Sequence, residues 1–214
     1  EIEVRERGMV LIANLWEGQK TGLFLDHRES RARVRALASE LAVLNLYGYT
    51  GGFSVAAGLG GAREVTTVDL AKPAIELAVR TFEANRLSMP HHALAEDVAQ
   101  FLKRAHEEQR RYQLVIADPP NFAPSQAKLE GALESYATLH GSALGLVEAG
   151  GLYLAASCSS HVRSGDFLDT LREGARRARR VLTILEQTGA PFDHPRLLAF
   201  PEGDYLKVVL CRVT

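Results

Sequence analysis

The feature that most constrains the fold is a regular alternation of apolar runs and amphipathic stretches that begins at residue 42. The stretches between the runs place apolar residues at helical spacing, as Ile75, Ala78, Val79 and Phe82 do. Strands that alternate with helices predict a mostly parallel sheet with helices on both faces. The apolar runs that predict buried strands are 43–46, 64–68, 92–95, 112–117 and 152–157.

The two ends of the chain depart from this alternation. The apolar runs 181–187 and 205–213 are joined by a long loop without a helical pattern, which predicts a closing antiparallel hairpin. The sequence therefore predicts an α/β fold with a seven-stranded, mostly parallel sheet. A small β unit is expected over 1–25, with strands at 10–15 and 22–25.

Four helices are expected at defined positions, and the one over 71–86 carries the apolar face named above. The patterns over 28–40 and 53–59 predict an arginine-rich helix and a short helix. A longer helix is expected over 129–147, stopped by Gly150 and Gly151, because glycine commonly ends helices.

Composition and charge are those of an ordinary globular chain. The 214 residues are 46% hydrophobic and 24% charged, and the formal net charge is −1. A nucleic-acid partner would therefore need a local basic patch rather than a strong overall field. One basic cluster is either a phosphate-contacting face or a solvated helix face: Arg172, Arg176, Arg177, Arg179 and Arg180.

The cysteines and the apolar runs indicate the compartment. Cys158 and Cys211 have neither metal-ligand spacing nor the pattern of a disulfide framework, which predicts a reduced, cytoplasmic protein without a metal. No apolar run is long enough for a membrane span, so no membrane partner is expected.

A short motif, Asp118-Pro119-Pro120-Asn121-Phe122, follows the buried strand 112–117. An Asp at the carboxyl end of such a strand lies where open α/β sheets bind ligands. The two prolines stiffen the turn and remove backbone donors, leaving carbonyl and carboxylate acceptors for the amino group or ring N–H of a planar substrate. The alternative is a strand followed by a rigid turn.

A glycine-rich turn, 48–52, lies between the first strand and its helix. Its spacing is neither that of a dinucleotide-binding motif nor that of a P-loop. Backbone donors at a helix N-terminus would suit a carboxylate, such as the amino-acid end of S-adenosylmethionine. A tight structural turn is the alternative.

Acidic side chains follow three successive strands. Asp69 could accept hydrogen bonds from ribose hydroxyls, and Asp97 could accept one from an adenine amino group. Each could instead cap a helix. Together with Asp118, they favour a ligand site at this edge of the sheet.

Cys158 lies in Ser157-Cys-Ser-Ser160, just past the fifth predicted strand. Hydroxyl neighbours and a helix start would favour an exposed thiolate there. Cys211, within an apolar strand, is expected in the core.

These motifs together resemble the class I S-adenosylmethionine-dependent methyltransferases. They are most similar to the bacterial large-subunit (23S) ribosomal RNA cytosine-5 methyltransferases, whose catalytic domain follows an N-terminal PUA domain. The resemblance implies a Rossmann-like methyltransferase domain over 26–214, with 1–25 as the remnant of a linker to an upstream domain. The matching stretches are 18–22 with 25–28, 43–53, 68–69, 118–122, 157–159, 193–195 and 201–207.

The resemblance also implies roles for individual residues. Asp69 would hold the ribose, Asp97 the adenine, and Asp118 both the cofactor and the target base, while Cys158 would be the nucleophile. The other implied cofactor contacts are Lys20, Thr21, Gly22, Arg28, Tyr49, Thr50, Gly51 and Phe53. The implied substrate contacts are Pro119, Pro120, Asn121, Phe122, His194 and Lys207. S-adenosylmethionine is the implied cofactor and large-subunit ribosomal RNA the implied partner; a homodimer is left open.

The residue types agree with carbon-5 chemistry. Carbon 5 of cytosine becomes nucleophilic after a thiolate adds to carbon 6, which needs an activated cysteine and a carboxylate at the ring edge. Two departures from the family are expected to matter. Asn121 stands where many relatives carry a second cysteine, so the base for the elimination step is unassigned, and without a PUA domain this chain is expected to bind RNA weakly.

Three alternatives remain open. Methyl transfer to nitrogen on a guanine, an adenine or a protein amide would need no cysteine, and Phe122 would then be a stacking ring. A catalytically silent RNA-binding module would use the basic cluster and no cofactor. An NAD-dependent oxidoreductase is disfavoured by the glycine spacing.

Overall fold

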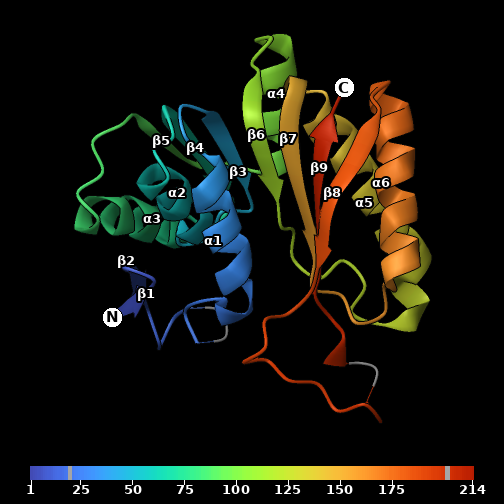
Figure 1. The fold of residues 1–214 in the computed structure, drawn as a ribbon, viewed down its shortest axis with the longest axis horizontal. Helices are drawn as coiled ribbons and strands as arrows, with labels where there is room; N and C mark the ends of the chain where they lie inside the picture. Colours follow the sequence, from blue (N-terminus) through green and yellow to red (C-terminus); the bar gives the residue numbers. More distant parts are fainter. Residues whose placement is uncertain (19–20, 201–202) are drawn as a thin grey trace. The chain divides into compact units, whose positions relative to one another are not determined.

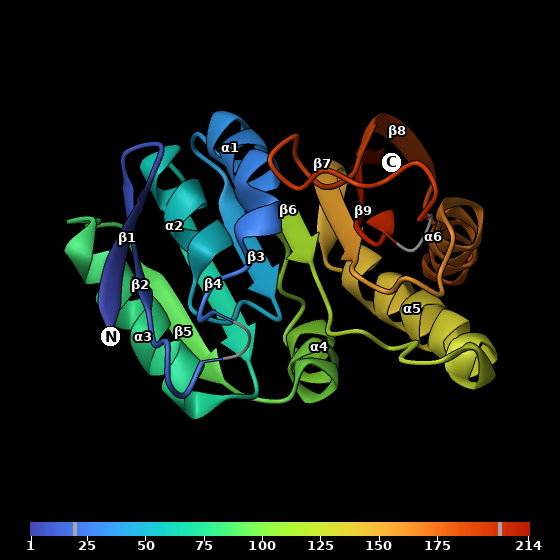
Figure 2. The same ribbon diagram turned by 90° about the horizontal axis from the view of Figure 1, so that it is seen from below.

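The computed structural model describes residues 1–18, 21–200 and 203–214. They form two compact units, Glu1–Phe101 and Leu102–Thr214 (Figures 1 and 2). Within the described residues, unit 1 holds three paired strands and a separate two-stranded sheet, and unit 2 holds four paired strands, so all seven predicted strands are present. None of the described helices has the length and apolar character needed to cross a membrane.

Unit 1 is built on three parallel strands in the order β5-β4-β3. Its elements are α1 (Arg28–Leu37), β3 (Ala42–Leu46), α2 (Gly52–Leu59), β4 (Glu64–Asp69), α3 (Lys72–Ala84), β5 (His91–Ala95) and the start of α4 (Val98–Glu107). Every residue of β3 is buried. Leu46 pairs with Val68, and Val68 with Leu94, so the carboxyl ends of the three strands are level.

A small β unit precedes these strands, as expected, but its strands differ from those predicted. The hairpin consists of β1 (Ile2–Glu6) and β2 (Met9–Ala13), and Leu25–His27 is a 3-10 turn rather than the end of a strand. Gly8, at φ +81°, allows the tight turn that joins the strands. The charged residues of β1 hid its strand character, because this strand is largely exposed.

The hairpin is held on α3 by side-chain hydrogen bonds. Asn85, just after α3, donates its amide to the Val10 carbonyl at 2.7 Å and accepts from the Val10 N–H at 2.9 Å. The Ile12 N–H donates to the Thr81 hydroxyl at 3.4 Å. The hairpin is thus an integral part of unit 1.

Unit 2 contains parallel and antiparallel strands in the order β6-β7-β9-β8. Its elements are β6 (Tyr112–Ala117), α5 (Leu129–Leu144), β7 (Val147–Ser157), α6 (Ser164–Ala178), β8 (Leu182–Thr188) and β9 (Lys207–Val213). β6 and β7 are parallel, whereas β9 runs antiparallel to both β7 and β8. The predicted C-terminal antiparallel hairpin is therefore confirmed, and α5 and α6 pack side by side (Figure 2).

The expected helix stop at Gly150 and Gly151 is wrong. The helix ends at Leu144, followed by Gly145, and the glycine pair lies inside β7. The register of β7 against β6 is irregular here: Tyr112 pairs with Val147, but Leu114 pairs with Leu152. Gly150, at φ +84°, allows the bulge that accommodates the extra residues of β7.

A buried ion pair joins the hairpin to α1. The Arg31 guanidinium donates to both carboxylate oxygens of Glu6, at 2.7 and 2.6 Å, and to the Phe24 carbonyl at 2.8 Å. The two charged side chains are only 5% and 8% exposed. The pairing satisfies each charge, so the loss of one partner would leave the other buried and uncompensated.

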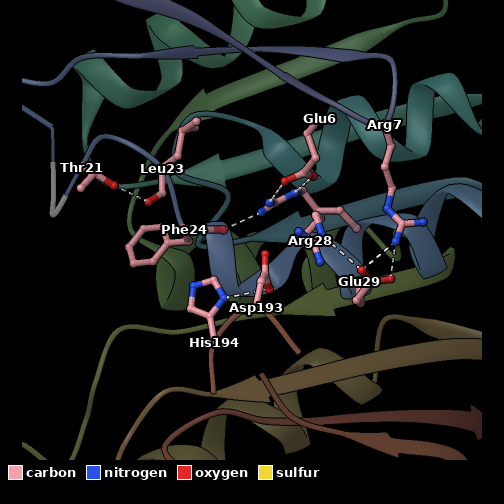
Figure 3. Close-up of polar contacts among 10 residues, drawn as sticks. Glu6, Arg7, Thr21, Leu23, Phe24, Arg28, Glu29, Asp193 and His194 are labelled. Carbon is pink, nitrogen blue, oxygen red and sulfur yellow. Dashed lines mark hydrogen bonds and ion pairs between the residues drawn. The ribbon is translucent and has the colours of Figure 1, made fainter. Parts of the chain in front are cut away.

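We therefore expect Arg31→Met to lower the free energy of unfolding by about 3–5 kcal/mol, because Glu6 would stay buried without its cation. Arg7→Met removes another Arg–Glu pair, in which one guanidinium nitrogen of Arg7 donates to both carboxylate oxygens of Glu29 and both side chains are about half exposed (Figure 3). That control should cost only about 0–1 kcal/mol. Urea denaturation of both variants tests the contrast, and equal losses would contradict it.

Candidate functional site

The glycine-rich turn of unit 1 has a backbone that few residues could adopt. Tyr49 and Gly51 have φ of +46° and +81°. The Gly48 N–H donates to the Val68 carbonyl at 2.9 Å. A Cβ on Gly48 would lie 2.4 Å from a Thr67 methyl, and one on Gly51 would lie 2.9 Å from the Ala78 Cβ. Close packing and positive φ therefore fix the shape of this turn.

Asp69, the last residue of β4, holds the turn in place. Its carboxylate accepts from the Tyr49 N–H and from the Ala71 N–H, both at 2.9 Å. Each carboxylate oxygen has a second lone pair. The same group can therefore anchor the turn and still accept from a ribose hydroxyl.

A chain of buried polar groups lies beneath the turn. Asn45 donates to the Ser54 hydroxyl at 2.9 Å, Ser54 is hydrogen-bonded to Thr67 at 2.6 Å, and Thr67 to His91 at 2.8 Å. Burial lowers the pKa of His91 to about 4, with a further contribution from His92, so the ring is neutral at pH 7. The sequence did not reveal this chain, because its members lie on three strands and a helix.

The other residues expected to contact the cofactor surround the same segment of unit 1. The rings of Tyr49 and Phe24 meet edge to face at 5.4 Å, and those of Phe53 and His27 at 5.3 Å. Thr50 is buried. The Arg28 guanidinium lies 3.2 Å from a carboxylate oxygen of Glu29 (Figure 3).

The segment before these residues is also shaped by a glycine. Gly22 has φ +81°, and a Cβ there would lie 2.8 Å from the Asn14 carbonyl oxygen. The Thr21 hydroxyl donates to the Leu23 carbonyl at 3.4 Å (Figure 3). Lys20, the remaining predicted contact here, lies outside the described residues.

These features fit an S-adenosylmethionine site. The N-terminus of α2 offers N–H donors without intrahelical partners, which suits the methionine carboxylate. Asp69 supplies an acceptor at the end of the next strand. Asp97 accepts from the Gln100 N–H at 3.0 Å as a helix cap, so the cap interpretation is confirmed and its adenine contact stays a prediction.

In unit 2, Asn121 links the Asp118 motif to the segment that carries Cys158. Its side-chain oxygen accepts from the Ser159 hydroxyl at 2.6 Å and from the Ala123 N–H at 2.9 Å. Pro119 is buried, Pro120 is exposed, and the Phe122 ring packs on Tyr136 with 4.8 Å between centroids. The structure thus brings together two motifs through a bond between residues 38 positions apart in the sequence.

Tyr136 of α5 is hydrogen-bonded to the segment that carries Cys158. Its hydroxyl is hydrogen-bonded to Ser157 at 3.0 Å and to Ser159 at 3.1 Å, on either side of Cys158. Burial raises the pKa of Tyr136, and the charges of Cys158 and Asp118 raise it further. The phenol is therefore neutral, and it lies within electrostatic range of both predicted catalytic groups. Sequence analysis did not identify it.

Lys207 reaches the same segment from β9. Its ammonium donates to the Ser159 carbonyl at 2.5 Å and to the Tyr205 carbonyl at 2.8 Å. Burial lowers the pKa of Lys207 to about 8, although the charges of Cys158 and Asp204 oppose the shift. Lys207, which was predicted to contact substrate, is only 3% exposed in this structure.

The remaining candidates are less informative. His194 is hydrogen-bonded to Asp193 at 3.1 Å (Figure 3), and no group of metal-ligand residues occurs in the part of the chain that the structure describes. Three of the five arginines of the basic cluster are ion-paired on the surface of α6. Arg172 pairs with Asp169, Arg176 with Glu173, and Arg177 with both Glu134 and Glu173. These pairs favour a solvated helix face over a phosphate-contacting one.

Comparison with known proteins agrees with this arrangement. Ribosomal RNA large subunit methyltransferase I of Erwinia tasmaniensis is 36% identical over 213 residues, which are 99% of this chain and 54% of that protein. A solved structure named as a candidate SAM-dependent methyltransferase from Streptococcus mutans has a TM-score of 0.89 and 31% identity, over 99% of this chain and 55% of that one. Another, with the same TM-score, identity and coverage, is a methyltransferase candidate complexed with SAH. The chain thus spans about half the length of the relatives it matches.

A family model shows the cofactor class directly. The model for S-adenosylmethionine-dependent methyltransferases matches residues 1–211. This match confirms the predicted cofactor and the Rossmann-like methyltransferase fold. The chain therefore belongs to the family of S-adenosylmethionine-dependent methyltransferases.

Proposed function

We propose that this chain methylates carbon 5 of a cytosine in large-subunit ribosomal RNA, in the cytoplasm, through a covalent adduct with Cys158. The observation that carries the proposal is the placement of Cys158 in unit 2, flanked by serines that hydrogen-bond Tyr136. Relatives named ribosomal RNA large subunit methyltransferase I support the RNA class. Methylation of a nitrogen would give no reason for a cysteine at this position.

The proposal assigns different tasks to the two units. In unit 1, the glycine-rich turn and Asp69 hold S-adenosylmethionine, which supplies an activated methyl group. Thr21, Gly22, Arg28, Tyr49, Thr50, Gly51, Phe53 and Asp97 complete this pocket, with Lys20. In unit 2, Pro119, Pro120, Asn121, Phe122, His194 and Lys207 form the surroundings of the target base.

Asp118 and Cys158 carry out the chemistry on the ring in this proposal. The Asp118 carboxylate accepts a hydrogen bond from the cytosine edge and orients the base. The Cys158 thiolate adds to carbon 6, and the ring electrons displaced to carbon 5 make that carbon nucleophilic. After methyl transfer, loss of the carbon-5 proton returns electrons to the ring and expels the thiolate.

The nitrogen-methylating alternative has less support in unit 2. It would use Phe122 as a ring that stacks on the target base. Phe122 is instead half-buried against Tyr136, with the ring planes tilted by 55°. Tyr136 therefore covers part of the Phe122 ring that would have to stack on the base.

Replacing Cys158 with Ala tests the nucleophile. We expect C158A to lose methyl transfer to an rRNA fragment while it binds SAH with unchanged affinity, because the substitution lies outside unit 1. The measurement is incorporation of radioactive methyl groups, with binding followed by calorimetry. Cys211→Ala is the matched control, because that thiol is buried within β9. Normal methyl transfer by C158A would contradict the mechanism.

RNA that contains 5-fluorocytosine tests the same step without a mutation. Fluorine at carbon 5 blocks the elimination, so the enzyme should remain covalently joined to RNA after methyl transfer. Mass spectrometry should then place the RNA on Cys158. Methyl transfer to the unfluorinated RNA without an adduct on the analogue would point to a nitrogen acceptor.

Asp69→Asn tests the cofactor half of the proposal. We expect affinity for SAH to fall by roughly 10-fold or more, because a carboxylate that accepts from both the turn and a ribose hydroxyl would lose acceptor strength. Glu64→Gln is the matched control, because Glu64 is the first residue of the same strand and is partly exposed. Calorimetric titration measures both, and unchanged affinity in D69N would contradict the assignment.

A further inference from the structure

We propose that Lys207 is a positioning residue that holds Cys158 as a thiolate, by placing an ammonium group beside it and by fixing the backbone that follows it. The inference deepens the proposed function, because it explains how Cys158 is kept ready to react. It assigns to Lys207 a role beyond contact with substrate.

The strand register brings the lysine to the cysteine segment. Lys207 is the first residue of β9 and pairs across the antiparallel ladder with Ser157, the last residue of β7. Cys158 follows Ser157 directly. The ammonium then donates to the carbonyl of Ser159 at 2.5 Å, so it spans the turn that carries Cys158.

The burial of Lys207 calls for an explanation. An ammonium that is 3% exposed has lost most of its water, and such burial is expensive unless the charge is compensated. The carbonyls of Ser159 and Tyr205 accept two of its hydrogen bonds but carry no charge. An apolar side chain could fill the same space without the desolvation cost, so packing alone does not account for a lysine.

In this proposal a negative charge on Cys158 supplies most of the compensation, and the Asp204 carboxylate supplies the rest. The charges of Cys158 and Asp204 raise the pKa of Lys207 against the larger effect of burial, which brings it to about 8. Electrostatic coupling is reciprocal, so the ammonium stabilises the thiolate as much as the thiolate stabilises the ammonium. Low local dielectric strengthens this coupling.

Among the described residues, Tyr136, Asp118 and Asp204 interact electrostatically with this part of unit 2 and supply no positive charge, whereas the basic side chains of His161 and Arg163 follow the segment in the chain. Tyr136, from α5, has a pKa raised by burial and stays neutral. Asp118, after β6, is coupled to Tyr136 and carries a negative charge that disfavours a nearby thiolate. Asp204 lies in the loop before β9 and acts on Lys207. The ammonium of Lys207 therefore opposes the field of these carboxylates.

The same charge would act twice in the reaction. When the thiolate adds to carbon 6, a sulfur–carbon bond forms and the ring electrons move toward carbon 5. After carbon 5 has taken the methyl group, a base removes the carbon-5 proton, the C–H electron pair re-forms the ring double bond, and the sulfur–carbon bond breaks with its electron pair returning to sulfur. Lys207 faces a thiolate before the first step and after the last, and no proton passes through it.

Alkylation of Cys158 as a function of pH tests the proposal. In a Cys211→Ala background, Cys158 is the only cysteine, so its reaction with iodoacetamide can be followed by intact-mass spectrometry. We expect Lys207→Met to move the midpoint of the profile up by about one pH unit and to slow alkylation at pH 7 by roughly tenfold. Lys207→Arg should restore most of the rate, because it keeps the charge. Lys103→Met, at an exposed position on α4, is the control and should have no effect.

A structural role would give a different result. If Lys207→Met leaves the alkylation profile unchanged while circular dichroism and SAH binding are normal, the lysine only fills space and the proposal is overturned. A second measurement leaves Lys207 intact, so that its result does not depend on whether a variant with two unpaired carbonyls folds. Carbon-13 NMR of the lysine ε-methylene groups should give a Lys207 midpoint near 8 in the wild type, and a lower one in Cys158→Ser. An unchanged midpoint would overturn the proposal.

Neither measurement needs RNA or methyl transfer, so the inference and the proposed function can fail separately. A shifted alkylation profile without a 5-fluorocytosine adduct would keep the lysine–cysteine pair and refute carbon-5 chemistry. An adduct on Cys158 with an unshifted profile would keep the chemistry and refute the role of Lys207.

Discussion

Parallel pairing at level register is the constraint on which each half of the candidate site depends. In unit 1, Leu46 pairs with Val68, so the turn after β3 meets the carboxylate at the end of β4 and Tyr49 N–H reaches Asp69. In unit 2, Ala117 pairs with Ala155, which brings the motif after β6 to the end of β7. Strand ends at one edge thus assemble polar groups far apart in the sequence.

The local patterns predicted most of the fold because hydrophobic periodicity follows burial. β6 was predicted to the residue, and the antiparallel C-terminal pair was recognised from its long loop without helical spacing. The incorrect predictions involved residue types that are common in two kinds of local structure. Gly150 and Gly151 fit a helix end as well as a strand bulge, and only the pairing of β7 with its neighbour distinguishes the two.

The candidate site was predictable only where chemistry was carried by residues at strand ends. Asp69 and Asp97 were proposed from their positions alone, although the same positions suit helix caps, and the bond from the Gln100 N–H to Asp97 shows the cap role. Tyr136 left no signal in the sequence, because its partners follow 21 and 23 residues later and a tyrosine within a helix usually means only packing. Burial of Lys207 was equally hidden, since a lysine at a strand start is normally exposed.

The buried groups around Cys158 divide into those that supply hydrogen bonds and those that supply charge. Among the described groups of unit 2, burial keeps Tyr136 neutral by raising its pKa, and keeps His140 neutral by lowering its pKa to about 3. Tyr136, which is hydrogen-bonded to Ser157 and Ser159, can therefore fix the geometry of the turn at any physiological pH without changing its charge. The pKa of Lys207 is instead about 8, so its ammonium group titrates close to neutral pH. In the proposed arrangement, a neutral hydrogen-bonded frame beside the titrating ammonium of Lys207 would make the reactivity of the thiol depend on that ammonium.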